Sequence, residues 1–322
     1  VKWDMNRNFS DIYSPYLPAA KQGETAHRYV LGLYQIMEEL TTRFPKILFE
    51  GCSAGGNRFD LGILCYFPQI WASDNTDALC RTGIQNSYSY GYPLSVFTAH
   101  VSSCPNHQTL RITPLETRFQ VASFGILGYE CNLKDLSGSD LNAIREQIAF
   151  YKKWRDVFQF GSFYRGAENE ASDSETLSWT CVSPDGRRAV GLFFRRLTVP
   201  NQSHDWYRPV GLLPDVKYHF YGRNIKYNLK DFGDLVNTVS PIHIKQGSAL
   251  QEILSRFVNM DGEKEDLTAY GDTLMRAGIA LKPAFAGTGY NSDSSRIFPP
   301  EFTLWKQWNK NNNAFLCTDH FR

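Results

Sequence analysis

Two aspartates, Asp4 and Asp74, stand where short apolar stretches typical of buried strands end. Asp4 follows residues 1–3, and Asp74 follows residues 69–72 after one further residue. In a barrel of parallel strands, the active site lies at the carboxyl ends of the strands. Carboxylates from two such ends can converge on one substrate. A pair of carboxylates that flanks one bond is what hydrolysis of a glycosidic bond requires.

Other polar residues near these strand ends have ordinary structural explanations, because an aspartate after a strand is commonly a turn or N-cap residue. We expect Asp77 to cap the following helix and Asp60 with Arg58 to form a turn or a structural ion pair. His100 is expected to be a structural histidine. A third strand end, residues 52–60, is rich in small residues that permit a tight loop.

The elements that must position these residues alternate between strand and helix. Apolar residues recur at three- and four-residue steps between residues 22 and 44, which predicts a helix with one apolar stripe. A capping box at Ser137 and Asp140 predicts the start of another helix, which continues to about Phe158. Further helices are expected at 77–90 and 113–120, and strands at 1–3, 47–49, 69–72, 94–98 and 121–126.

This alternation predicts an α/β fold with a parallel sheet. A closed eight-stranded barrel needs about 250 residues, whereas the pattern ends near residue 158. We therefore expect residues 1–158 to be the C-terminal part of a (β/α)8 barrel, about strands 4 to 8, with three earlier strands absent from this chain.

The second half of the chain has short, alternating apolar stretches bounded by turns, which predict an all-β sandwich over residues 159–305. Residues 221–268 look irregular apart from a helix at 249–257. Residues 306–322 are polar and give no structural expectation. The strands expected here are 179–182, 189–194, 216–220, 275–281 and 302–305.

Composition narrows the class of partner. The formal net charge is +1 without a basic run, which argues against nucleic acid or an anionic membrane as the main partner. No run of 18 apolar residues predicts a membrane span. Seven cysteines without a C-x-x-C pair favour a reducing compartment, hence the cytoplasm. The chain begins at Val1 rather than Met, so a signal peptide before it stays open. No metal-ligand spacing occurs, and no cofactor is expected.

Three segments in order carry a family resemblance: K-W-D-M-N-R at 2–7, C-S-A-G-G-N-R-F-D at 52–60 and Q-I-W-A-S-D-N-T-D at 69–77. Together with residues 99–118 they resemble the α-galactosidases of glycoside hydrolase family 36. The resemblance covers residues 1–165 and continues more loosely to Trp305. Ala54 and Asn57 stand where many relatives have Gly.

The resemblance implies a retaining α-galactosidase that acts on oligosaccharides such as melibiose and raffinose. Asp4 would be the nucleophile and Asp74 the general acid/base, with their carboxyl groups roughly 5–5.5 Å apart. Asp74 would be partly buried beside Trp71, which would also contact the substrate. Lys2 would keep Asp4 ionised and donate to sugar hydroxyls.

By the same resemblance, Cys52 and Gly55 would line the pocket near the 2-hydroxyl, where their small size favours galactose over N-acetylgalactosamine. Each residue also has a structural reading: a core thiol for Cys52, a tight loop for Gly55 and a core aromatic for Trp71.

Two alternatives remain open: a raffinose-synthase-like enzyme that passes galactose to a sugar acceptor, and a non-catalytic module. The resemblance further implies a longer parent that is a homo-oligomer, and the isolated chain is expected to be inactive.

Overall fold

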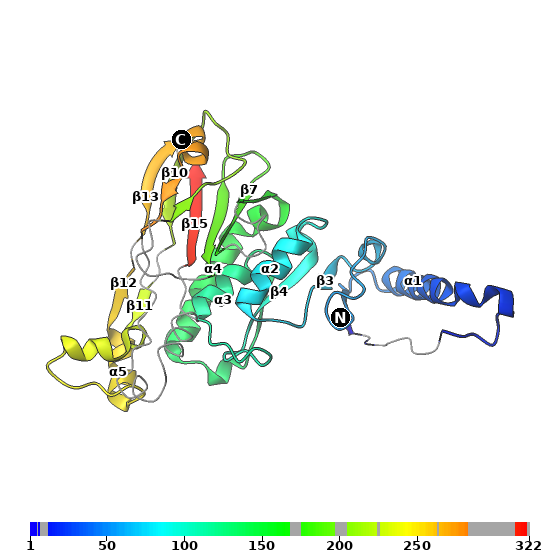
Figure 1. The fold of residues 1–322 in the computed structure, drawn as a ribbon, viewed down its shortest axis with the longest axis horizontal. Helices are drawn as coiled ribbons and strands as arrows, with labels where there is room; N and C mark the ends of the chain where they lie inside the picture. The colour runs from blue at the N-terminus through cyan, green and yellow to red at the C-terminus, as the bar shows by residue number, and fades with distance from the viewer. Residues whose placement is uncertain are drawn as a thin grey trace.

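The computed structural model describes residues 1–4, 6, 12–167, 175–196, 205–223, 226–262, 264–282 and 313–320. Figure 1 shows an elongated molecule in which helix α1 (Thr25–Arg43) projects from one end and an antiparallel sheet lies toward the other. Helices α2 (Ala78–Tyr88), α3 (Leu115–Ala122) and α4 (Gly138–Phe160) lie between them. No helix among the described residues is long and apolar enough to cross a membrane.

The first half forms a five-stranded sheet whose strands follow chain order and are all parallel. This confirms the predicted α/β arrangement and the five strands. The strands are β1 (Lys2–Asp4), β2 (Glu50–Cys52), β3 (Gln69–Trp71), β4 (Phe97–Ser102) and β5 (Ile126–Glu130). Short 3-10 turns occur at Ala19–Glu24, Ile63–Cys65, Leu94–Val96 and Leu133–Asp135.

Three of the predicted strand positions were wrong by several residues. The strand expected at 47–49 begins only at Glu50, because Phe49 packs its side chain into an apolar cluster instead. The stretch Leu94–Val96 is a 3-10 turn that precedes β4, and Val121 belongs to the buried side of α3. A short apolar run fits a buried strand or a buried helix turn equally well, so periodicity alone could not separate them.

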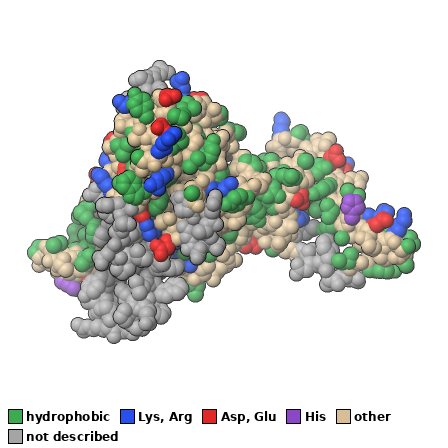
Figure 2. All heavy atoms as spheres, turned by 45° about the horizontal axis from the view of Figure 1, so that its top comes forward, with side chains coloured by type: hydrophobic (Ala, Val, Ile, Leu, Met, Phe, Trp, Pro, Cys, Tyr) green, Lys and Arg blue, Asp and Glu red, His purple; other side chains and the backbone are tan. Residues whose placement is uncertain are grey.

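Helix α1 has the predicted apolar stripe, but only part of it is covered. Leu33 and Met37 are buried against the second and third strands, whereas Val30 and Phe44 remain 39% and 48% exposed. Figure 2 shows apolar side chains on the surface of this projecting arm. Helix α1 therefore packs on the sheet through its central turns only.

The two faces of the parallel sheet differ in character because successive side chains along a strand point to opposite sides. On one face Phe97, Ala99 and Val101 enter the apolar core together with residues of α3 and α4. The opposite face carries polar or aromatic side chains at the ends of the strands, as the pairing of Asp4 with Cys52 illustrates. A sheet with one apolar and one functional face can present several strand ends to one ligand.

Helix α4 joins the two halves of the molecule. It begins with the predicted capping box, in which the Ser137 hydroxyl accepts from the N–H of Asp140. Its buried side chains, among them Trp154 and Phe158, pack against Trp179 and Val190 of the second sheet. The second sheet is therefore anchored directly on the helix that follows β5.

The second sheet has six antiparallel strands in the order β13-β10-β15-β8-β7-β6. Strand β15 (Asn313–His320) lies in its middle, although we had no structural expectation for residues 306–322. The other strands are β6 (Ser162–Arg165), β7 (Thr176–Val182), β8 (Ala189–Arg195), β10 (Lys217–Gly222) and β13 (Asp266–Tyr270).

The face of this sheet away from α4 carries a small second layer. It consists of β9 (Trp206–Tyr207), β14 (Ile279–Ala280) and helix α6 (Gly271–Arg276), which share an apolar cluster with β8 and β10. The strand expected at 275–281 was correct only at Ile279–Ala280, because Met275 and Arg276 end helix α6. A sandwich of two extended sheets stays a prediction, and the strand expected at 302–305 lies outside the described residues.

A small lobe follows β10. Strands β11 (Lys226–Asn228) and β12 (Asn259–Asp261) pair with each other. Between them lie a kinked 3-10 segment, Leu229–Thr238, and helix α5 (Ala249–Phe257). The helix confirms the prediction for 249–257. The irregular structure expected around it holds for residues 239–248 but was wrong where residues 226–228 pair with residues 259–261.

Candidate functional site

The structure brings the predicted residues together at the carboxyl end of the parallel sheet. Asp4 and Cys52 are neighbours in register at the ends of β1 and β2. The Nζ atom of Lys2 lies 4.7 Å from the centre of the Trp71 ring at the end of β3. The indole N–H of Trp71 donates to Oδ1 of Asp74 at 2.9 Å. Three strand ends therefore supply one connected group of side chains.

The carboxyl group of Asp74 is anchored but not enclosed. The residue is exposed among the described residues, although we expected partial burial beside Trp71. Trp71 itself is only 3% exposed and lies beneath the loop that carries Asp74. Asp74 is therefore open to solvent, while the hydrogen bond from the indole fixes the position of its carboxyl group.

Cys52 links the two ends of this group. Its side chain is 1% exposed, and burial raises the pKa of its thiol. The neighbouring carboxylate of Asp4, with which the thiol forms a hydrogen bond, raises that pKa further, whereas Lys2 and the backbone of Gly55 act in the opposite direction. The thiol is therefore neutral near pH 7 and serves Asp4 as a hydrogen-bonding neighbour.

Gly55 packs the loop after β2 against the backbone that carries Asp74. Its φ of +80° lies in the left-handed region, which other residues adopt at a cost. A Cβ atom at this position would lie 2.8 Å from Cα of Ser73 and 3.1 Å from the backbone nitrogen of Asp74. Only glycine permits this approach, so residues 52–60 help to set where Asp74 stands.

Substitution of Gly55 with alanine is expected to displace Asp74. The left-handed conformation costs about 1–2 kcal/mol for an L-residue, and the backbone contact adds to that cost. Because a misplacement of about 1 Å can lower catalysis about 100-fold, we expect a loss of that order in kcat/KM for any reaction in which Asp74 takes part. Gly83→Ala is the matched control, since a Cβ there meets nothing within 4 Å in helix α2. Equal kinetics for the two variants would contradict the role given to Gly55.

Three further residues belong to the same group but were not predicted as functional. His100 of β4 stacks on Trp71 with ring centres 4.6 Å apart, and its Nδ1 lies 3.0 Å from Oε2 of Glu130 at the end of β5. Arg81 of α2 lies against Trp71 as well, with its Cζ 4.5 Å from the ring centre. The position of Glu130 after a predicted strand could have identified it as a candidate functional residue. No local sequence pattern identifies Arg81 as one.

The structural readings of the remaining acidic residues hold in part. Asp77 caps α2 and accepts the N–H of Cys80 at 2.9 Å, as predicted. Asp60 accepts the N–H of Ile63 at 2.9 Å and so forms a turn. Among the described residues Arg58 donates to the carbonyl of Cys52 and does not pair with Asp60. The turn was therefore correct, and the ion pair was not.

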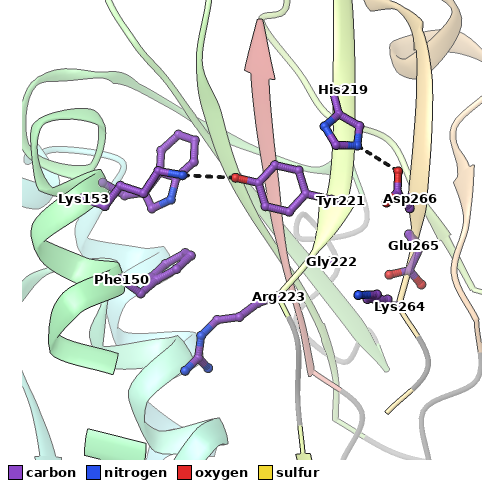
Figure 3. Close-up of a pocket in the computed structure, with 10 residues that line it drawn as sticks. Phe150, Lys153, His219, Tyr221, Gly222, Arg223, Lys264, Glu265 and Asp266 are labelled. Carbon is purple, nitrogen blue, oxygen red and sulfur yellow. Dashed lines mark hydrogen bonds and ion pairs between the residues drawn. The ribbon is translucent and has the colours of Figure 1, made fainter. Parts of the chain in front are cut away.

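A separate cavity of about 410 Å³ lies between α4 and the second sheet (Figure 3). His219 pairs with Asp266 at 2.8 Å on the sheet side of the cavity, and Lys153 of α4 donates to the hydroxyl of Tyr221 at 3.4 Å. His219 and Asp266 pair with each other, whereas Arg223 pairs with Glu116, so the charged groups drawn there do not converge on one point. This cavity therefore offers no arrangement comparable to the strand-end group, by which we mean the connected side chains of Lys2, Asp4, Cys52, Trp71 and Asp74.

Comparison with known families finds two matches along the chain. The family described as Melibiase matches residues 1–161, and the family described as the glycosyl hydrolase family 36 C-terminal domain matches residues 176–298. The first match contains every residue of the strand-end group.

Comparison with individual proteins agrees. The chain is 50% identical over 218 residues to alpha-galactosidase 1 of Pediococcus pentosaceus, covering 68% of this chain and 30% of the relative. It is 46% identical over 225 residues to alpha-galactosidase AgaA of Geobacillus stearothermophilus, covering 70% of this chain and 31% of the relative. The chain therefore spans about a third of the length of these relatives.

Solved structures show the same fold. The α-galactosidase from Lactobacillus brevis superposes with a TM-score of 0.76 at 34% identity, covering 100% of this chain and 35% of that one. A variant of AgaA in complex with raffinose superposes with a TM-score of 0.74 at 35% identity, covering 99% and 35%. A further AgaA variant, in complex with stachyose, has a TM-score of 0.73.

Proposed function

Because the chain belongs to the melibiase family of glycosyl hydrolases, we propose that it carries the catalytic carboxylates of a retaining α-galactosidase. Asp4 is the nucleophile and Asp74 the general acid/base of this proposal. The observation that carries it is the connected group at one end of the sheet, in which Asp4 adjoins Cys52 in register and Asp74 is fixed by the Trp71 indole. The proposal requires the two carboxylates to face one common space, and their places after β1 and β3, two strands of one parallel sheet, support it.

The relatives support the choice of these two residues. In the AgaA complex with raffinose one aspartate has been substituted, and in the complex with stachyose another has been. Those two aspartates lie as far apart in the AgaA sequence as Asp4 and Asp74 lie in this one. Both complexes contain α-galactosyl oligosaccharides, so we propose the same class of substrate here, with melibiose and raffinose as examples.

The reaction then proceeds by double displacement. A carboxylate oxygen of Asp4 attacks the anomeric carbon while the proton of Asp74 passes to the leaving oxygen, which gives a β-galactosyl ester on Asp4. In the second step Asp74 takes a proton from water, and that water displaces Asp4 from the anomeric carbon. Each displacement inverts the configuration, so the product is α-galactose.

The neighbouring side chains take supporting parts. Lys2 donates to sugar hydroxyls in this proposal. Cys52 and Gly55 leave room at the 2-hydroxyl but little for an acetamido group. Trp71, being 3% exposed, supports Asp74 through its N–H more than it offers a face to the sugar.

The arrangement of the whole protein is also a proposal. We infer that the five parallel strands are the last five of a closed (β/α)8 barrel, since β1 and β5 each have one unpaired edge among the described residues. The six-stranded sheet would belong to a C-terminal β-sandwich. A homo-oligomeric parent rests on the family resemblance, and a cytoplasmic location rests on the odd number of cysteines without a C-x-x-C pair.

The function is tested by product analysis with the natural protein that carries this chain. We expect hydrolysis of melibiose, with α-galactose as the first product seen by proton NMR before mutarotation. With galactinol as donor and sucrose as acceptor, we expect free galactose to exceed raffinose. Raffinose as the main product would favour the transferase, and β-galactose as the first product would contradict the retaining mechanism.

A further inference from the structure

Arg81 is a buried cation whose hydrogen bonds bracket Asp74. The residue lies in the first turn of α2 and is only 3% exposed. Its Nη2 donates to the carbonyl of Ser73 at 2.6 Å, and its Nε donates to the carbonyl of Asn75 at 2.8 Å. These carbonyls belong to the residues on either side of Asp74, so one guanidinium holds the peptide group that joins Ser73 to Asp74 and the peptide group that follows Asn75.

The same guanidinium ties this loop to the sheet and to the indole. Its Nη1 lies 3.3 Å from the carbonyl of Thr98 on β4. Its plane lies against Trp71, whose indole N–H holds the carboxyl group of Asp74. Arg81 therefore constrains Asp74 along two routes, through the backbone on both sides and through the ring that holds its side chain.

The positive charge of Arg81 distinguishes its hydrogen bonds from those of an ordinary loop contact. Burial lowers the pKa of Arg81 to about 10, and the carboxylates of Asp74 and Glu130 act against that shift, so the group remains a cation near neutral pH. In the described part of the chain no carboxylate lies within ion-pair distance of it. The hydrogen bonds that the structure gives this cation all go to backbone carbonyls, which is costly unless the loop geometry is needed.

We propose that Arg81 is a positioning residue for the proton transfer by Asp74. This inference rests on the proposed function, in which Asp74 protonates the leaving oxygen. The guanidinium holds the carboxyl group where its proton reaches that oxygen, and it touches neither the sugar nor the bond that breaks. Its loss therefore harms protonation of the leaving group much more than attack by Asp4.

The test compares leaving groups in the natural protein that carries this chain. A dinitrophenyl α-galactoside departs without protonation, whereas the glucose of melibiose needs a proton. For Arg81→Met we expect kcat/KM for melibiose to fall about 100-fold and that for the dinitrophenyl galactoside to fall less than about 10-fold. Arg81→Lys keeps the charge and one donor, so part of the loss with melibiose should be recovered.

Arg118→Met is the matched control. Arg118 is also a partly buried guanidinium that donates to carbonyls of a neighbouring loop, those of Ser102 and Thr113, but it has no contact with the Asp74 loop. Its loss should change both substrates by the same factor. Thermal unfolding and circular dichroism of each variant show whether the fold persists.

The outcomes distinguish a failure of the positioning role of Arg81 from a failure of the proposed function of Asp74. If Arg81→Met lowers both substrates equally, or leaves melibiose unchanged, the positioning role is wrong while the proposed function stands. If Asp74→Asn itself shows no dependence on the leaving group, the assignment of the general acid fails. Should Arg81→Met not fold, Arg81→Lys alone decides, since a positioning role still requires the larger loss with melibiose.

Discussion

Asp4→Asn is expected to abolish turnover, with kcat reduced on the order of 10⁴-fold or more, as for other enzymes that lose a nucleophile. The amide keeps the shape of the side chain, but its oxygen is a poor nucleophile and cannot form the galactosyl ester. Because Asp4 is exposed at the end of β1, the substitution should leave the fold intact. The measurement is kcat for melibiose and for a nitrophenyl α-galactoside.

Two controls make the loss at Asp4 specific. Asp215→Asn changes another exposed aspartate, in the turn before β10 and far from the strand ends, and should retain full activity. Added azide should restore turnover to an Asp4→Gly variant and yield β-galactosyl azide, because the small anion enters the space of the lost carboxylate. Undiminished hydrolysis by Asp4→Asn would instead favour a non-catalytic role for this residue.

Asp74→Asn is expected to lower kcat/KM for melibiose by about 10²–10⁴-fold, the usual contribution of general acid catalysis. A dinitrophenyl α-galactoside should react at nearly the normal rate in the first step, because its leaving group needs no proton. Its second step lacks a base, so the galactosyl ester should accumulate and give a burst of the phenol. Azide, which needs no base, should relieve this block and give α-galactosyl azide.

The opposite configurations of the two azide products separate the roles of the carboxylates. Attack in place of Asp4 inverts the substrate once, whereas attack on the ester of Asp4 inverts it a second time. If Asp74→Asn gave the β-azide, or lost activity equally with every leaving group, the two roles would have to be exchanged or abandoned.

Much of the site could be predicted because its signals are local. Asp4 and Asp74 follow apolar stretches of the kind that form parallel strands, and the ends of such strands meet at one edge. The start of helix α4 was equally predictable, because Ser137 and Asp140 each accept a hydrogen bond from the backbone N–H of the other within one turn. These features depend on neighbours a few residues apart, which the sequence displays directly.

Other features depend on contacts between distant residues. The strand β15 pairs on both sides, with β8 and β10. The apolar run at residues 314–317 fits a strand, but nothing within it shows which distant strands it joins. The exposure of Asp74 depends on how its loop packs against the rest of the molecule, which no local pattern shows. Arg81 acquires its role only when the carbonyls of Ser73, Asn75 and Thr98 converge around it, which no spacing in the sequence encodes.

The ester on Asp4 is the central claim, and trapping it tests the claim most directly. The natural protein would be treated with an α-galactosyl fluoride that carries a second fluorine on the ring to slow the second step, then digested and analysed by mass spectrometry. The account predicts one fluorogalactosyl group, on the peptide that contains Asp4, and protection by melibiose. A label on a different residue, or no label under conditions that inactivate the enzyme, would contradict it.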